Sequence, residues 1–171
     1  MKTSKPKILK VWIEHKPDES PDTSHMGEYA GRPANEYAID RKESGDMNRN
    51  EHRWFNPSFN YVDDNGNPKD GLTPADVRKY VQEDYRRMES LNTGRWSYIG
   101  IIAKAEVQLS ENHLIQVLRS GGLWGVESDC GDKYLSEIHA DELASLRAEL
   151  EAVGFGKRAI DYAFKTVGQP Q

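Results

Sequence analysis

The chain has 171 residues, 36% of them hydrophobic and 30% charged, and a formal net charge of -5. This length predicts a single domain, 1–171, that buries a core without disulfides. The one cysteine, Cys130, excludes an internal disulfide framework. No apolar run approaches the roughly 18 residues of a membrane span, and the stretch after the basic start is too short for a signal peptide. We therefore expect a cytoplasmic protein that has no membrane partner.

The charge is unevenly distributed, because residues 126–171 carry nine acidic side chains against five basic ones. Non-specific binding to nucleic acid depends on neutralising phosphates with lysine and arginine. Direct nucleic-acid binding is therefore not expected, although a role through Lys79, Arg86, Arg87 and Arg95 stays open as an alternative. The acidic C-terminal segment, 126–171, either makes the protein soluble or mimics the charge of a nucleic acid and so binds a basic partner.

The first expected element is a strand at residues 9–13, where apolar and polar side chains alternate. A polar segment, 15–71, follows, and its only valine, isoleucine or leucine residues are Ile39 and Val62. The segment predicts a long, mostly irregular excursion that is attached to the domain by its aromatic residues. These aromatic residues are Tyr29, Tyr37, Trp54, Phe55, Phe59 and Tyr61.

Residues 72–167 predict a compact core of one helix, three strands and two further helices. The first helix begins after Thr73, which is a suitable N-cap, with Pro74 at the first helical position. Strands are expected at 96–109, 114–119 and 123–128, with a chain reversal at Ser120–Gly122, which predicts an antiparallel meander. The fold class is therefore α+β, with a sheet of about four strands and two to three helices on one face.

The most informative run is 120–129, in which Gly121, Gly122 and Gly125 bracket Trp124. Glycine allows tight turns and close backbone approach, and tryptophan offers a large, rigid contact surface. The acidic residues Glu127, Asp129 and Asp132 follow, and they lack the loop pattern of a calcium site. A solvated acidic turn is the favoured interpretation of these three carboxylates.

A second run, 22–29, combines Asp22, His25 and Tyr29 within the polar excursion. It predicts either a contact loop or a turn docked by Tyr29. A metal-dependent enzyme that uses His25, Asp22 and His52 stays open as the alternative. None of the five histidines has the tight spacing of a metal motif, so no catalytic residue, metal or cofactor is predicted.

Three stretches, 22–29, 95–101 and 120–129, resemble uncharacterised small accessory proteins of bacteriophages and mobile elements. The resemblance spans most of residues 8–155 and implies no catalytic residue, because no activity is established for that group. It implies an accessory gene of a mobile element, and many such proteins bind host machinery, including host-defence complexes of the restriction or CRISPR kind.

These observations lead to the hypothesis of a non-enzymatic module that binds a host protein complex and inhibits host defence. Large aromatic residues are enriched among the anchors of protein interfaces. The sequence leaves the oligomeric state open. The expected partner-binding residues are Trp54, Phe55, Trp124, Glu127, Asp129, Asp132, Asp22, His25 and Tyr29.

Overall fold

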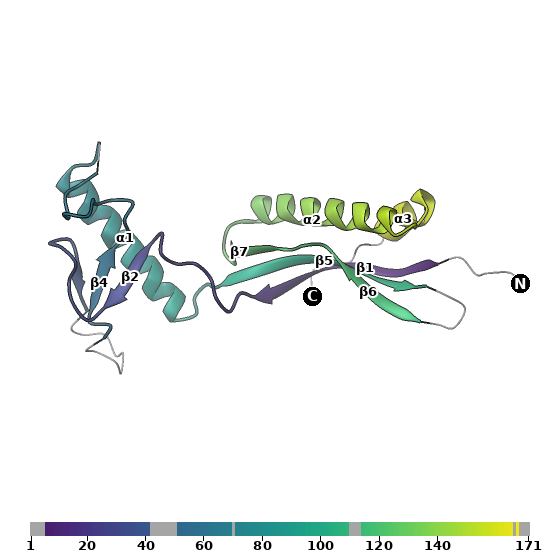
Figure 1. Ribbon diagram of the computed structural model, residues 1–171, viewed down its shortest axis with the longest axis horizontal. Helices are drawn as coiled ribbons and strands as arrows, with labels where there is room; N and C mark the ends of the chain where they lie inside the picture. Colours follow the sequence, from purple (N-terminus) through teal and green to yellow (C-terminus); the bar gives the residue numbers. More distant parts are fainter. Residues whose placement is uncertain (1–5, 42–50, 70, 110–113, 166, 168–171) are drawn as a thin grey trace, which may run out of the picture. The chain divides into compact units, whose positions relative to one another are not determined.

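The computed structural model describes residues 6–41, 51–69, 71–109, 114–165 and 167 (Figure 1). The chain folds as two compact units: unit 1 comprises Met1–Pro21 and Ser97–Gln171, and unit 2 comprises Asp22–Trp96. Unit 2 is thus inserted between the two chain segments that build unit 1. The helix that begins after Thr73 was expected in the core of 72–167, and it lies in unit 2 with the polar excursion.

Unit 1 contains a four-stranded antiparallel sheet in which three strands pair with one long central strand. Strand β5 pairs with β1 on one edge, whereas β6 and β7 follow one another along its other edge. The four strands are β1 (Lys7–Pro17), β5 (Tyr98–Gln108), β6 (Ile115–Arg119) and β7 (Leu123–Glu127).

The α+β class with a sheet of about four strands is confirmed, but the connection between β6 and β7 differs from the expected reversal. Residues 120–122 do not turn β7 back onto β6. They interrupt one edge strand, so that β6 pairs with 104–108 and β7 pairs with 98–101 of β5. An interruption of this kind is a bulge, which leaves the chain running along the same partner.

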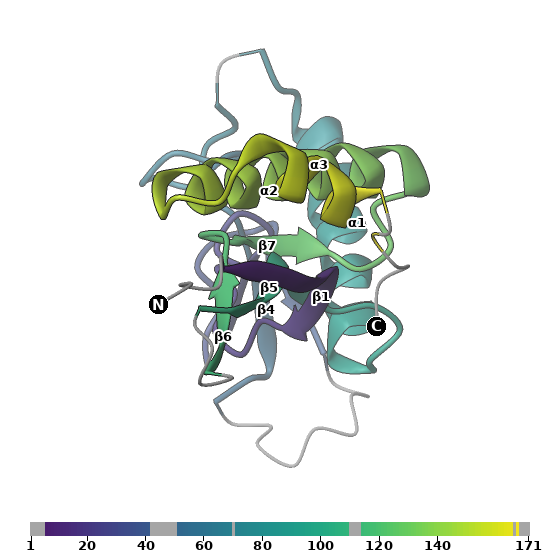
Figure 2. The same cartoon turned by 90° about the vertical axis from the view of Figure 1, so that its right-hand side faces the viewer.

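Two helices, α2 (Asp132–Ala152) and α3 (Lys157–Phe164), cover one face of this sheet (Figures 1 and 2). Successive side chains of a strand point to opposite faces of the sheet, and the odd-numbered side chains of β5 face the helices. The resulting core joins the sheet to both helices through fully buried side chains. These include Ile101, Ala103, Ala105, Val107, Leu146, Leu150 and Ile160.

Unit 2 packs a small three-stranded antiparallel sheet beside helix α1 (Pro74–Asn92). Thr73 forms a capping box with Asp76, and Gly94 takes a φ of 69° just beyond the helix. The sheet has the order β2-β4-β3, with strands β2 (Gly27–Ala30), β3 (Ile39–Asp40) and β4 (Trp54–Pro57).

The polar excursion, which was expected to be mostly irregular, therefore contains the three short strands β2, β3 and β4. The aromatic residues give the physical reason, because Phe55 is fully buried and contacts Tyr29 edge to face, with ring centroids 5.6 Å apart. Helix α1 supplies the aliphatic side chains that the excursion lacks, including Val77 and Val81, which are both buried. None of the described helices is both long enough and apolar enough to span a membrane.

Candidate functional site

The interruption between β6 and β7 is held by Glu142 of α2. Ser120 is buried, and its Oγ accepts the Ala103 N–H at 3.0 Å while its own hydroxyl donates to the Glu142 carboxylate. The same carboxylate accepts the Gly122 N–H at 3.1 Å. Because buried polar groups must be paired, Glu142 makes it possible to break the edge strand next to the core.

Trp124 lies on the sheet face opposite the helices, where its ring packs directly over Gly100. A Cβ at Gly100 would overlap that ring. Gly125 has a φ of 74°, and its N–H donates to the Asp18 carboxylate at 3.1 Å. The indole thus packs against backbone on one side, yet Trp124 as a whole remains 48% exposed.

A line of exposed side chains continues from Trp124 along the same edge. In register, Val117 lies opposite Glu106 and Ile115 lies opposite Gln108, on the face that α2 and α3 leave uncovered. Val117 and Ile115 are 52% and 54% exposed. We call Ile115, Val117, Arg119 and Trp124 the β6–β7 stripe.

The β6–β7 stripe is long enough for a segment of another protein. The β5 positions beneath Trp124 and beside Val117 are Gly100 and Glu106, which are about 20 Å apart at the rise of a β-strand. Exposed apolar surface of this kind commonly marks an interaction site. Within the described residues of unit 1, no helix covers this face of the sheet.

Charged residues surround the β6–β7 stripe. Lys104 and Glu14 form an ion pair at 2.5 Å, and the hydrogen bond from Lys104 holds the pKa of Glu14 below its usual value. Arg119 lies opposite Lys104 in register and is exposed. Arg119 therefore sits next to a lysine whose charge Glu14 already neutralises.

Beneath α2, on the covered side of the sheet, His15 of β1 meets His139. Their Nε2 atoms are 2.8 Å apart, so one ring donates its Nε2–H to the other. Burial lowers the pKa of both imidazoles, and the pKa of His139 is lowered further by His15. A neutral pair thus joins α2 to β1.

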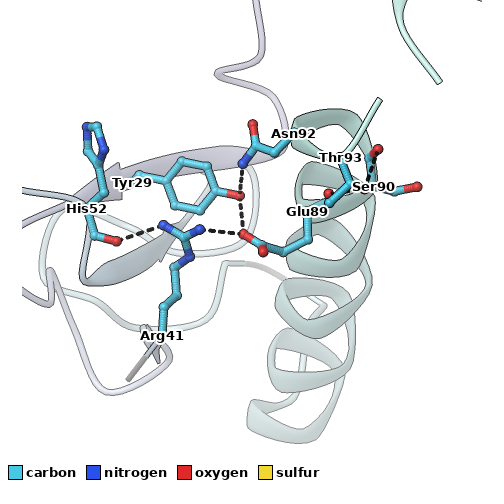
Figure 3. Close-up of polar contacts among 7 residues, drawn as sticks. All are labelled: Tyr29, Arg41, His52, Glu89, Ser90, Asn92 and Thr93. Atoms are coloured by element: carbon cyan, nitrogen blue, oxygen red, sulfur yellow. Dashed lines mark hydrogen bonds and ion pairs between the residues drawn. The ribbon is translucent and has the colours of Figure 1, made fainter. Parts of the chain in front are cut away.

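In unit 2 the main polar cluster joins the small sheet to α1 (Figure 3). The buried Arg41 guanidinium donates to Glu89 at 2.7 Å and to the His52 carbonyl at 2.8 Å, and it lies 3.9 Å from the centre of the Tyr29 ring. Tyr29 also donates to Glu89, and it accepts a hydrogen bond from Asn92. Burial and the bond to Glu89 raise the pKa of Tyr29, so its hydroxyl stays protonated and acts as a structural donor.

A cleft of about 360 Å³ opens in unit 2 beside the turn at Asp63. Asn56 lies in its wall, and the side chain of Asn56 is bound to the Ala34 N–H and to the Arg32 carbonyl. The Asp63 carboxylate accepts the N–H groups of Asn67 and Asn65, and the bond from Asn67 lowers its pKa. The polar groups named here are therefore occupied by local structure.

The structure separates the expected contact residues of the excursion into different environments. Phe55 is fully buried in the core of unit 2, so its side chain offers no surface to a partner. Tyr29 is half-buried in the cluster with Arg41, and Trp54 is half-exposed on β4. Asp22 is exposed, and it accepts the Ser24 N–H in a local turn next to the exposed His25.

The acidic residues after Trp124 extend from the end of β7, at Glu127, through the turn at Asp129 to the first residue of α2, Asp132. Glu127 is half-buried opposite Tyr98, whereas Asp129 and Asp132 are exposed. Among the described residues, no three histidine, cysteine, aspartate or glutamate side chains gather as a metal-binding group. This holds for the three acids and for the combination of Asp22 with two histidines of the excursion.

Comparison of the chain with protein-family models, curated proteins and solved structures finds no match. The candidate site therefore depends on the geometry alone.

Sequence reasoning missed the roles of Ser120, Glu142 and the two paired histidines. A signal for the histidines is present, because His15 continues the buried alternation of Val11 and Ile13. His139 precedes Leu143 by one helical turn on α2, and Leu143 packs against the core. The partner of Glu142 could not be read from the sequence, because Glu142 lies 22 residues from Ser120.

Proposed function

We propose that the protein is a non-enzymatic module that binds another protein through the uncovered face of the unit 1 sheet. The observation that carries the proposal is the exposed Trp124, which is oriented by Gly100 and continued by the exposed Ile115 and Val117. A rigid aromatic group costs little conformational entropy when it is buried in an interface, because its orientation is already set.

The proposed partner is a protein complex of a host cell, and the proposed outcome is inhibition of host defence. The resemblance of 22–29, 95–101 and 120–129 to accessory proteins of bacteriophages and mobile elements supports this part of the proposal. The place of action would be the host cytoplasm.

Affinity capture from a host lysate tests the proposal. The tagged protein, Trp124→Ala and Tyr162→Ala are compared after nuclease treatment, and retained proteins are identified by mass spectrometry. Tyr162 is the matched control, because this aromatic residue of α3 is 76% exposed and lies outside the β6–β7 stripe.

We expect a stoichiometric, nuclease-resistant partner that is retained by the wild type and by Tyr162→Ala and is lost with folded Trp124→Ala. Circular dichroism checks that the variants are folded. Absence of a partner would contradict the proposal, as would a partner that Trp124→Ala retains in full or one that nuclease removes.

A further inference from the structure

The outer edge of β6 is left without a strand partner in the described structure. Leu109 N–H donates to the Leu114 carbonyl at 3.1 Å, and Ser120 N–H donates to the Ala103 carbonyl at 2.9 Å. Even-numbered residues of β6 therefore bond to β5. In an antiparallel ladder the alternate residues direct their N–H and C=O groups away from that partner, and here these residues are 115, 117 and 119.

The opposite edge of the same sheet carries protection against strand pairing. Natural sheets protect their edges with lysines, prolines and bulges, and β1 has all three: Lys7, Lys10, Pro17 and a register shift between Ile8 and Lys10. Strand β6 pairs with β5 without a register shift and contains no proline, and Arg119 is its only charged residue.

Charge complementarity identifies the occupant of this edge. Arg119 is exposed and lies beside Lys104, which pairs with Glu14, and within the described parts of the chain Arg119 has no ion pair. A carboxylate opposite Arg119 would supply one. A second copy of the chain cannot do so through β6, because this strand contains no acidic residue and antiparallel self-pairing about Val117 sets Arg119 against Ile115.

We infer that β6 accepts an extended segment of the partner protein as an additional strand, with an acidic residue of the segment facing Arg119 and apolar residues facing Ile115 and Val117. Strand addition supplies affinity through main-chain hydrogen bonds and specificity through alternate side chains. This inference rests on the proposed function, since it names the partner chemistry for the same face of unit 1.

The test selects ligands for the full-length protein from a surface-displayed library of random twelve-residue peptides. Binding of the selected peptides is then measured by fluorescence anisotropy with the wild type, Val117→Pro, Val117→Thr and Arg119→Glu. Proline at 117 removes an outward N–H and leaves the bonds to β5 intact, whereas threonine keeps the N–H and nearly the same shape. Circular dichroism checks each fold.

We expect selected peptides with alternating apolar residues and at least one acid. Val117→Pro and Arg119→Glu should each weaken binding at least tenfold, and Val117→Thr should change it less than threefold. The inference would be overturned if the library yields no binding peptide, if the selected peptides are basic, or if Val117→Pro binds them as tightly as the wild type does. A dimer in sedimentation that Val117→Pro dissociates would overturn it in favour of a second copy.

The two proposals fail separately. A captured partner that Trp124→Ala loses and folded Val117→Pro retains would overturn strand addition and leave the proposed function standing. A partner that Trp124→Ala retains would overturn the proposed function itself.

Discussion

At the scale of single residues, the position of Trp124 in the glycine-rich run depends on its contact with Gly100 of β5. The indole occupies the space that a Cβ at Gly100 would fill, whereas Gly121, which also belongs to the run, has nothing within 4 Å of its Cβ position. Close packing makes additions at such a contact costly. The site therefore depends on a glycine 24 residues away in the sequence, which no local pattern indicates.

Replacing Gly100 with alanine should displace the Trp124 ring and lower the free energy of unfolding by about 1–3 kcal/mol, the usual cost of overpacking. Chemical denaturation followed by tryptophan fluorescence measures both effects. Gly121→Ala is the control, and it should stay within about 0.5 kcal/mol of the wild type. Equal effects of the two substitutions would contradict this packing.

Ser120→Ala should destabilise the protein by about 1–3 kcal/mol, because it leaves the Ala103 N–H without its hydroxyl acceptor and removes the donor to Glu142. The free energy of unfolding from urea denaturation measures the loss. A change below about 0.5 kcal/mol would show that the strand interruption does not need this hydroxyl.

The pair of His15 and His139 predicts a dependence of stability on pH. Burial lowers the pKa of both side chains from the ordinary value of 6.5, so the unfolded chain binds more protons just below that pH. Their contribution to stability should be complete above pH 6.5, and it should be lost as the pH falls from 6.5 toward the folded pKa values.

Urea denaturation at pH 8 and at pH 5.5 measures this dependence. His139→Gln should lose less stability between the two pH values than the wild type does. His25→Gln, which changes an exposed histidine of unit 2, should keep the wild-type dependence. The same pH dependence in His139→Gln and in the wild type would contradict the role of the pair.

At the scale of elements, the sequence predicts those that follow local rules. Thr73 and Pro74 mark the start of α1, and the alternation of residues 98–108 identifies β5. The pairing of β7 with β5 could not be predicted, because the interruption at Ser120 is stabilised by a carboxylate of α2. The strands of the polar excursion were missed because their stability comes from aromatic and α1 contacts distant in sequence.

Removal of the cap of α1 should destabilise unit 2. Thr73→Ala deletes the hydroxyl that accepts the Asp76 N–H. Of the capping box, only the hydrogen bond from the Thr73 N–H to the Asp76 carboxylate then remains. We expect a loss of about 1 kcal/mol, measured by thermal denaturation followed by far-ultraviolet circular dichroism. Thr73→Ser is the control, because it keeps the hydroxyl, and its stability should equal that of the wild type. No loss of stability in Thr73→Ala would contradict the role of the cap.

At the scale of the whole molecule, unit 2 is one continuous segment with its own buried centre. Phe55, Val77 and Val81 are at most 1% exposed, and Arg41 joins the small sheet to α1 within the same unit. Unit 1 needs both chain segments, because β1 and β5 come from opposite sides of the insertion. The change in composition at residues 15–71 is visible in the sequence. The pairing of two segments that lie far apart along the chain is not.

Residues 22–96 should therefore fold when they are produced alone. We expect a cooperative thermal transition and a near-ultraviolet circular dichroism signal from the packed aromatic residues, with modest stability because small domains bury a limited core. A non-cooperative transition without a near-ultraviolet signal would contradict the independence of unit 2.

We propose that the uncovered sheet face of unit 1 contacts the partner. Hydrogen–deuterium exchange of the captured complex, compared with the free protein, tests it most directly. We expect new protection at 115–119 and 123–127, with exchange in α2, α3 and unit 2 unchanged. Protection confined to α2 and α3 or to unit 2, with the β6–β7 stripe exchanging as in the free protein, would contradict it.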